Sequence, residues 1–149
     1  GITNAMVRSA PPAAQVMQEV AAFVGERPLL AHNASFDQKF WDAELALIRR
    51  QRVQTFACSL LLSRRLLPMA PSHKLGNLNR WAGLPDTGKA HRALADAEMA
   101  ANLTCFMASL LRERHAVADI THGLLCRLQQ VPVAKIPQAL QALRERQAV

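Results

Sequence analysis

Helical and strand-like patterns of apolar positions alternate along the first third of the chain. Two prolines at positions 11 and 12 predict the start of a helix that Gly25 ends. Its apolar positions, expected to cover a sheet, are Val16, Met17, Val20, Phe23 and Val24. A short apolar run from Pro28 to Ala31, bounded by turn formers, predicts a buried strand. This strand carries His32 and Asn33 at its C-terminal end.

The same alternation continues to position 114. Ser35 or Asn33 is expected to cap a helix, whose predicted buried stripe is Phe36, Phe40, Leu47 and Ile48. A strand is predicted over Val53 to Cys58, and Ser59 then caps a short helix that ends before Pro68. Two more helices are predicted at 74–81, before Gly83, and at 93–114, with the packing candidates Ala93, Ala97, Ala100, Ala101 and Met107. This order indicates an α/β domain.

Residues 116–149 contain apolar positions at helical spacing but no motif. The positions are Leu124, Leu125, Leu128, Ile136, Leu140 and Leu143, and Pro132 and Pro137 are expected to break the helices. We therefore divide the chain into residues 1–115 and a helical C-terminal extension, 116–149, which packs on the domain or on a partner.

The composition fits one soluble domain of 149 residues, half of them apolar. The net charge of +7 favours a polyanionic partner such as nucleic acid, although basic residues also serve as ordinary solvated surface. Cys58, Cys105 and Cys126 are widely spaced and predict neither disulfides nor a zinc site, which fits a reducing cytoplasm. No apolar run approaches the ~20 residues of a membrane span.

Two motifs carry the chemical information. HNASFDQKF at 32–40 reads H-N-x-x-x-D-x-x-F, and HRALADAEMAANL at 91–103 reads H-x-A-x-x-D-A-x-x-x-A before an Ala-rich helix. In this order they resemble the second and third signature blocks of the DEDDh, or DnaQ-like, 3'-to-5' exonuclease superfamily. Within that superfamily the resemblance is greatest to the epsilon-type members. The resemblance extends from position 1 to about position 112. It implies a ribonuclease H-like α/β fold with a mixed sheet flanked by helices.

The first signature block of that superfamily, an Asp-x-Glu pair on a strand, has no counterpart in this sequence. We therefore expect residues 1–115 to be the C-terminal part of an exonuclease domain without its opening strands. Without that pair the chain holds only half of the metal acids, so the fragment is expected to be inactive. Loss of central strands exposes unpaired backbone, so the fragment is also expected to be unstable, domain-swapped or homodimeric.

The resemblance implies a site for two Mg²⁺ or Mn²⁺ ions, which prefer carboxylate oxygens. It assigns Asp37 to the metal on the leaving-group side and Asp96 to the metal that carries the attacking water. It also makes His91 the general base, since an imidazole titrates close to neutral pH. Taken singly, each acid is an ordinary first-turn helix residue and His91 an ordinary loop histidine. The two motifs in order favour the nuclease interpretation.

Five further residues are candidates for substrate binding. His32 and Asn33 lie at the strand end, where functional residues are common in α/β sheets. The alternative is that His32 packs in the interior and Asn33 caps the helix. Phe36 either fills the core with Phe40 or contacts terminal bases. Lys89 and Arg92 flank His91 and are candidates for phosphate contacts. The two tryptophans, Trp41 and Trp81, are expected to pack.

The predicted function is hydrolysis of single-stranded DNA 3' ends to nucleoside 5'-monophosphates, with a DNA polymerase subunit as a candidate partner. A 3'-to-5' exoribonuclease of the same superfamily has the same site, because nothing in the sequence reads a 2'-hydroxyl. A catalytically silent module that binds nucleic acid or protein is the third interpretation.

Overall fold

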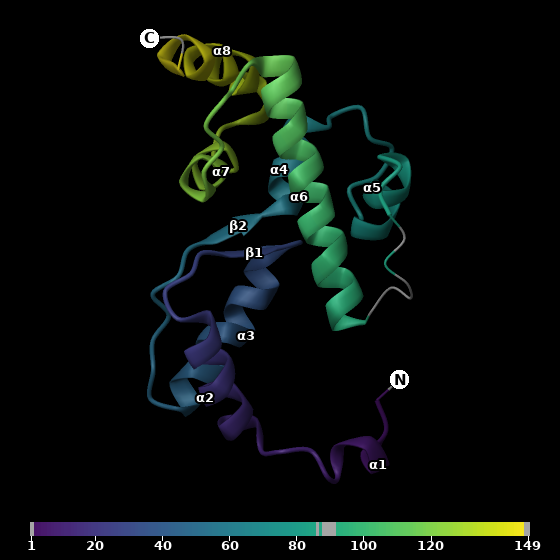
Figure 1. Cartoon of the computed structure of the whole chain (residues 1–149), viewed down its shortest axis with the longest axis vertical. Helices are drawn as coiled ribbons and strands as arrows, with labels where there is room; N and C mark the ends of the chain where they lie inside the picture. Colours follow the sequence, from purple (N-terminus) through teal and green to yellow (C-terminus); the bar gives the residue numbers. More distant parts are fainter. Residues whose placement is uncertain (1, 86, 88–91, 148–149) are drawn as a thin grey trace. The chain divides into compact units, whose positions relative to one another are not determined.

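The computed structural model describes residues 2–85, 87 and 92–147, shown in Figure 1. They belong to two compact units. Unit one consists of Gly1–Arg27 and Phe36–Gln54, and unit two of Pro28–Ser35 and Thr55–Val149. None of the helices in the described ranges is both long enough and apolar enough to cross a membrane.

Unit one begins with two helices. Helix α1 (Asn4–Val7) is capped by the Thr3 hydroxyl, and α2 (Ala13–Val24) follows Pro12 and ends at Gly25, whose φ of +56° suits glycine. The prediction of α2 is confirmed. Its predicted packing is met only in part: Val16, Met17, Val20 and Val24 are half-buried, whereas Phe23 is 81% exposed. The spacing of apolar residues identifies the helix but not the depth to which its face is covered.

Helix α3 (Ala34–Leu47) packs through a different face from the predicted one. The predicted stripe is wrong, because Phe36, Phe40 and Leu47 are exposed. A second apolar row, offset by one position, contains Trp41 and Leu45, and Leu45 is buried; Ile48, the predicted residue just after the helix, is half-buried. Two rows of similar length compete on this helix, and the sequence pattern did not distinguish them. Ser35 lies inside α3 and is not its cap; Asn33 precedes the helix with a φ of +67°.

Hydrogen bonds of polar side chains connect the segment after α3 to helices α2 and α3 of unit one. The buried Gln54 side chain donates to the Gly25 carbonyl and accepts from Trp41 Nε1 at 3.3 Å. Arg52 makes two hydrogen bonds with the Asp42 carboxylate, at 2.6 and 3.3 Å, and a third with the Gln54 carbonyl. These contacts tie the segment after α3 to the ends of α2 and α3, and Trp41 packs as expected.

Unit two contains a sheet of two parallel strands, β1 (Leu29–Ala31) and β2 (Phe56–Cys58), with Leu29 opposite Phe56. The chain is thus α/β, mostly helical, but within the described residues the sheet is parallel rather than mixed. Strand β2 also starts later than predicted, since Val53 is exposed. The ribonuclease H-like architecture stays a prediction.

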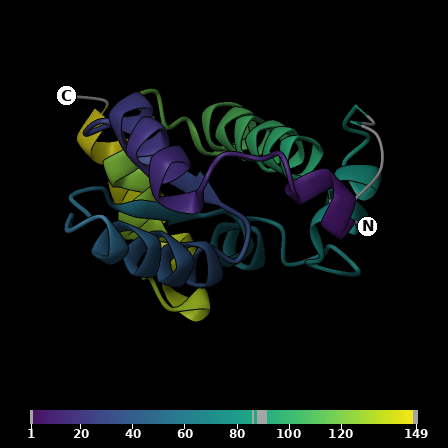
Figure 2. The same ribbon diagram turned by 90° about the horizontal axis from the view of Figure 1, so that it is seen from below.

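Three helices follow the sheet in unit two: α4 (Ser59–Leu66), α5 (Leu75–Trp81) and α6 (Ala93–His115). Helix α6 contacts α4, α5 and β1, as Figures 1 and 2 show. The completely buried large side chains of these helices are Leu62, Leu78, Leu103, Met107 and Leu111. Predicted packing at Ala100 and Met107 is confirmed, whereas Ala93, Ala97 and Ala101 are exposed.

The C-terminal segment packs into the same core. It forms α7 (His122–Leu128), a 3-10 turn η1 (Val133–Lys135) and α8 (Ile136–Gln147). Its buried residues, which join the core of unit two, are Leu124, Leu125, Leu128, Ile136 and Leu140. Pro132 precedes η1, but Pro137 lies in the first turn of α8, where proline is tolerated, so the break predicted there is wrong. The domain boundary at 115 stays a prediction.

The Gln129 side chain closes the outer edge of β2. Its Oε1 accepts the Cys58 N–H at 2.6 Å, and its Nε2 donates to the Phe56 carbonyl at 3.0 Å. A neighbouring strand would fill this same donor and acceptor pair, because residues i and i+2 of a parallel strand present them at one edge. The side-chain amide therefore replaces a third strand, and the C-terminal segment is part of the sheet's hydrogen bonding.

Replacing Gln129 by Ala leaves the Cys58 N–H and the Phe56 carbonyl without this partner. We expect the free energy of unfolding, measured by urea titration, to fall by about 1 kcal/mol or more, since one unsatisfied buried group such as the Cys58 N–H costs ~1–3 kcal/mol. The matched control is Gln130→Ala, at the exposed neighbouring position, which should change it by less than about 0.5 kcal/mol. Equal effects of the two substitutions would show that the amide bridge does not hold the strand.

Candidate active site

Residues of the first motif lie where β1 leads into α3. His32 and Asn33 follow β1 directly, and Asp37 is an exposed residue in the first turn of α3. The first peptide N–H of the helix, at Ala34, donates to the Sγ of the buried Cys58 at 3.4 Å. This contact attaches the start of α3 to the C-terminal end of β2, so the backbone just before Asp37 is fixed by the sheet.

Both ring nitrogens of His32 are hydrogen-bonded. Nε2 lies 3.0 Å from the His73 carbonyl oxygen and Nδ1 lies 2.9 Å from Ser59 Oγ. A carbonyl can only accept, so Nε2 carries a proton and donates it. In the neutral ring Nδ1 then accepts from the Ser59 hydroxyl. Of the two interpretations for His32, this geometry favours the packed histidine, which joins the end of β1 to the segment before α5.

Ser59 was expected to cap α4, and this expectation is wrong. Cys58 occupies the N-cap position, and Ser59 is the first residue of the helix, completely buried. Its hydroxyl faces His32 and also lies 3.5 Å from the Ala31 carbonyl. The Ser59 hydroxyl therefore pairs with the His32 imidazole instead of capping the helix.

A second pair continues the network. The buried Ser63 donates to the Leu60 carbonyl at 2.9 Å, which leaves its oxygen to accept from His73 Nδ1 at 3.0 Å. Burial, and after it the positive charge of Arg64, lowers the pKa of His73 below its ordinary value of 6.5. Sequence analysis missed Ser59, Ser63 and His73 as a group; their signal is two serines four apart that follow a strand, with a histidine before the next helix.

The second motif begins helix α6. Asp96 is half-buried in the first turn, and its N–H donates to the carbonyl of Arg92, the exposed N-cap residue. Thr87 Oγ1 donates to the Ala95 carbonyl at 3.0 Å, which attaches the preceding segment to the same turn. His91 and Lys89 lie outside the described residues, so their expected roles stay predictions.

The two candidate metal ligands fit divalent metals by chemistry but are incomplete in number. Asp37 and Asp96 offer the carboxylate oxygens that Mg²⁺ and Mn²⁺ prefer. Asp37 belongs to unit one and Asp96 to unit two, so their convergence stays a prediction. Within the described ranges no group of three His, Cys, Asp or Glu side chains could hold a metal ion.

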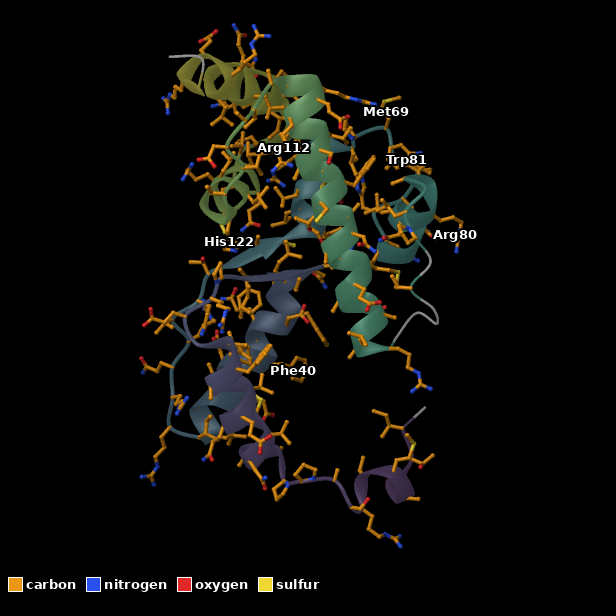
Figure 3. All side chains as sticks on the ribbon, in the orientation of Figure 1. Phe40, Met69, Arg80, Trp81, Arg112 and His122 are labelled. Atoms are coloured by element: carbon orange, nitrogen blue, oxygen red, sulfur yellow. The ribbon has the colours of Figure 1, made fainter. Side chains whose placement is uncertain are left out.

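Phe36 and Phe40 form an exposed aromatic pair on α3. Their ring centroids are 4.8 Å apart and the ring planes are tilted by 55°. Both side chains are more than half exposed, and Figure 3 labels Phe40. The interpretation that they fill the core is therefore wrong, and an apolar contact with bases is the remaining interpretation for Phe36.

The fold and these motifs define a small α/β domain of the nuclease type. Comparison with known proteins agrees: a family model described as "Exonuclease" matches residues 1–104. The chain belongs to this exonuclease family, which is the DEDDh, or DnaQ-like, group. No solved structure matches the chain.

Relatives of the chain include PolC-type DNA polymerase III proteins of three bacteria. The protein of Streptococcus pneumoniae is 33% identical over 121 residues, which cover 80% of this chain and 8% of the relative. That of Oceanobacillus iheyensis is 36% identical over 99 residues (66% and 7%), and that of Halalkalibacterium halodurans is 33% identical over 115 (76% and 8%). The chain thus spans less than a tenth of the length of these relatives.

The His32 geometry predicts a tautomer. In the neutral ring the proton should reside on Nε2, because that nitrogen faces a carbonyl. Nitrogen-15 chemical shifts of the imidazole at pH 7.5 report which nitrogen is protonated. A proton on Nδ1 would contradict the hydrogen bond to the His73 carbonyl, and Ser59→Ala should perturb the Nδ1 shift alone.

Stability should depend on the titration of His73. Its folded-state pKa is lower than 6.5, so below about pH 6.5 the unfolded chain binds more protons, and the free energy of unfolding decreases as pH falls. Above that pH its contribution is fully present. Urea titrations at pH 7.5 and 5.5 should show a smaller decrease for His73→Asn, whose amide can still donate to Ser63. Identical pH slopes of variant and parent would refute this assignment.

Proposed function

We propose that the chain is part of a metal-dependent 3'-to-5' exonuclease that shortens DNA and releases nucleoside 5'-monophosphates. The observation that carries the proposal is the exonuclease family match together with two acids, Asp37 and Asp96, each in the first turn of a helix. A helix N-terminus favours negative charge, which suits carboxylates at these two positions to bind cations.

The reaction displaces an alkoxide from a phosphodiester, and divalent metal ions, when bound, stabilise the charge on the attacking and leaving oxygens. The chain's own contribution is to hold the ligands and the substrate. Asp37 and Asp96 are the proposed ligands, and His91 is proposed to take the proton from the attacking water. The hydrogen bonds of His32 position the backbone from which α3, and so Asp37, begins.

Binding of the DNA end is assigned to residues beside these acids. Asn33 lies at the end of β1, where its polar side chain is exposed. We propose that Phe36 contacts the terminal base and that Lys89 and Arg92 contact phosphates. Arg92, at the N-cap of α6, is exposed, which suits a phosphate contact.

The open edge of β1 offers a pairing position for the strand that carries the Asp-x-Glu block of the superfamily. Leu29 donates its N–H to the Thr55 carbonyl at 3.1 Å, so strand alternation turns the backbone groups of Leu30 away from β2. In the described sheet β1 has no other neighbour. We propose that a strand bearing the Asp-x-Glu pair aligns with β1 and completes the metal ligands beside Asp37.

The relatives' names guide the choice of substrate. PolC-type DNA polymerase III synthesises DNA by name, so we propose DNA rather than RNA as the substrate and a polymerase as the partner. The silent-module alternative rests on a specific observation, the lack of a three-residue metal site among the described residues. The open edge of β1 would in that case pair with a partner or with a second copy of the chain.

The test compares the chain alone with a fusion in which an Asp-x-Glu segment of a related exonuclease precedes Gly1. With 5'-labelled DNA and Mn²⁺, the fusion should shorten the strand stepwise. Asp37→Asn and Asp96→Asn should each lower the rate by about 100-fold or more, because each removes a charged metal ligand. Glu98→Gln, at an exposed acid two residues after Asp96, is the control and should keep the rate within about twofold.

The outcomes separate the interpretations. Shortening of labelled RNA in preference to DNA favours the exoribonuclease. Binding of DNA by a folded fusion without shortening favours the silent module. Activity that survives both aspartate substitutions contradicts the proposed site.

A further inference from the structure

The net charge of the chain is concentrated in one stretch. Residues 45–85 contain seven Lys or Arg and no Asp or Glu, whereas the rest of the sequence contains eleven of each kind. The whole formal charge of +7 therefore lies in this stretch. Within unit two the stretch forms β2, α4 and α5. This charge distribution does not involve Asp37 or Asp96.

The four cations of the stretch in unit two have different roles. Arg65 is structural, since it donates to the carbonyls of Val131 at 2.7 Å and Leu61 at 2.9 Å. Arg64, Lys74 and Arg80 are exposed, and within the described residues their charged groups have no ion pair or hydrogen bond; the Ser72 hydroxyl accepts only the backbone N–H of Lys74. Three solvated cations without acidic neighbours in sequence are available to an anionic partner.

The fold brings together the two segments that carry Arg64 and Lys74. Ser63 and His73, which are hydrogen-bonded at 3.0 Å, immediately precede Arg64 and Lys74. The charge of Arg64 contributes, after burial, to the low pKa of His73, as expected of a cation close to that ring. Arg80 lies six residues after Lys74 on α5, a rise of about 9 Å. The spacing suits contacts with successive phosphates of an extended strand.

An aromatic side chain adjoins these cations. Trp81 is 45% exposed, so the expectation that it packs is only half met, and it follows Arg80 directly. Met69, in the segment that leads to α5, is 86% exposed. Figure 3 shows Met69, Arg80 and Trp81 on the α5 side of α6. Cations interleaved with an exposed aromatic ring are typical of surfaces that bind single-stranded nucleic acid, where bases stack on the ring.

We infer that Arg64, Lys74, Arg80 and Trp81 form a binding surface for single-stranded nucleic acid, separate from the proposed catalytic acids. The three cations contact phosphates, and Trp81 stacks on one base. A single strand fits better than a duplex, because only unpaired bases offer their faces to an aromatic side chain. An acidic protein surface is the competing occupant, and displacement by polyglutamate distinguishes it from a single strand.

The experiment measures binding of a labelled 12-nucleotide oligothymidylate to the full chain by fluorescence anisotropy. EDTA is present, so cleavage cannot occur and failure of the proposed exonuclease activity does not affect the result. The test variant is Lys74→Gln with Arg80→Gln. The matched control, Arg112→Gln with Arg114→Gln, removes the same charge from exposed positions on α6. Circular dichroism confirms that both double variants are folded.

The test variant should raise Kd by about fivefold or more, and the control by less than about twofold. The slope of log Kd against log salt should fall by about 1.4 in the test variant, the value for two lost phosphate contacts on a single strand. Equal weakening by the two pairs would overturn the inference, because binding would then follow net charge alone. No weakening by the test pair would overturn it as well.

Trp81 provides a direct readout of stacking. In Trp41→Phe the remaining tryptophan is Trp81, and its fluorescence should be quenched by the oligonucleotide. Trp81→Ala should raise Kd by about fivefold or more, since stacking on one base is worth ~1–3 kcal/mol. Unchanged fluorescence, or full displacement of the oligonucleotide by polyglutamate of equal charge, would overturn the proposal in favour of an acidic protein partner.

Discussion

A two-stranded sheet has two edges whose backbone groups need partners, and unit two is built around this constraint. One edge is satisfied by the Gln129 amide, which reaches β2 from the C-terminal segment. His122, labelled in Figure 3, adds a contact from α7, since its Nε2 donates to the Leu29 carbonyl at 2.9 Å. Both residues lie beyond the family match, so the C-terminal segment supports the strands that precede the candidate site.

The strand ends are held by an equally specific set of hydrogen bonds. His32 and Ser59 lie at the C-terminal ends of β1 and β2 and contact each other, and the His32 ring extends the connection to the segment before α5. These partners are far apart in sequence, which makes the arrangement a property of the fold. Because the chain just before α3 is fixed, the helix begins at a defined place and Asp37 lies in a defined turn.

The sequence predicted the elements better than their packing. Proline and glycine at the ends of α2, and glycine after α5, have strong local preferences, so these helices were located within about two residues. Burial depends on neighbours distant in sequence. Helix α3 has two competing apolar rows, and Phe36 and Phe40 belong to the one that stays exposed.

The candidate site was likewise predicted in its local motifs but not in its tertiary contacts. The motifs identified the family, because ordered polar residues at fixed spacing are a property of the sequence alone. The Ser59–His32 and Ser63–His73 pairs were not predicted, since each depends on tertiary contacts between segments at least ten residues apart. Convergence of Asp37 and Asp96 would depend on tertiary contacts in the same way and stays a prediction.

The position where the family match stops has a practical meaning for anyone who isolates this domain. Residue 104 lies in the middle of α6, whose later residues Met107 and Leu111 have no exposed surface. A cut there would divide one continuous helix and remove the leucines of α7 and α8 from the same core. The family model and the packed core therefore differ in extent, and the core reaches beyond α6 into α8.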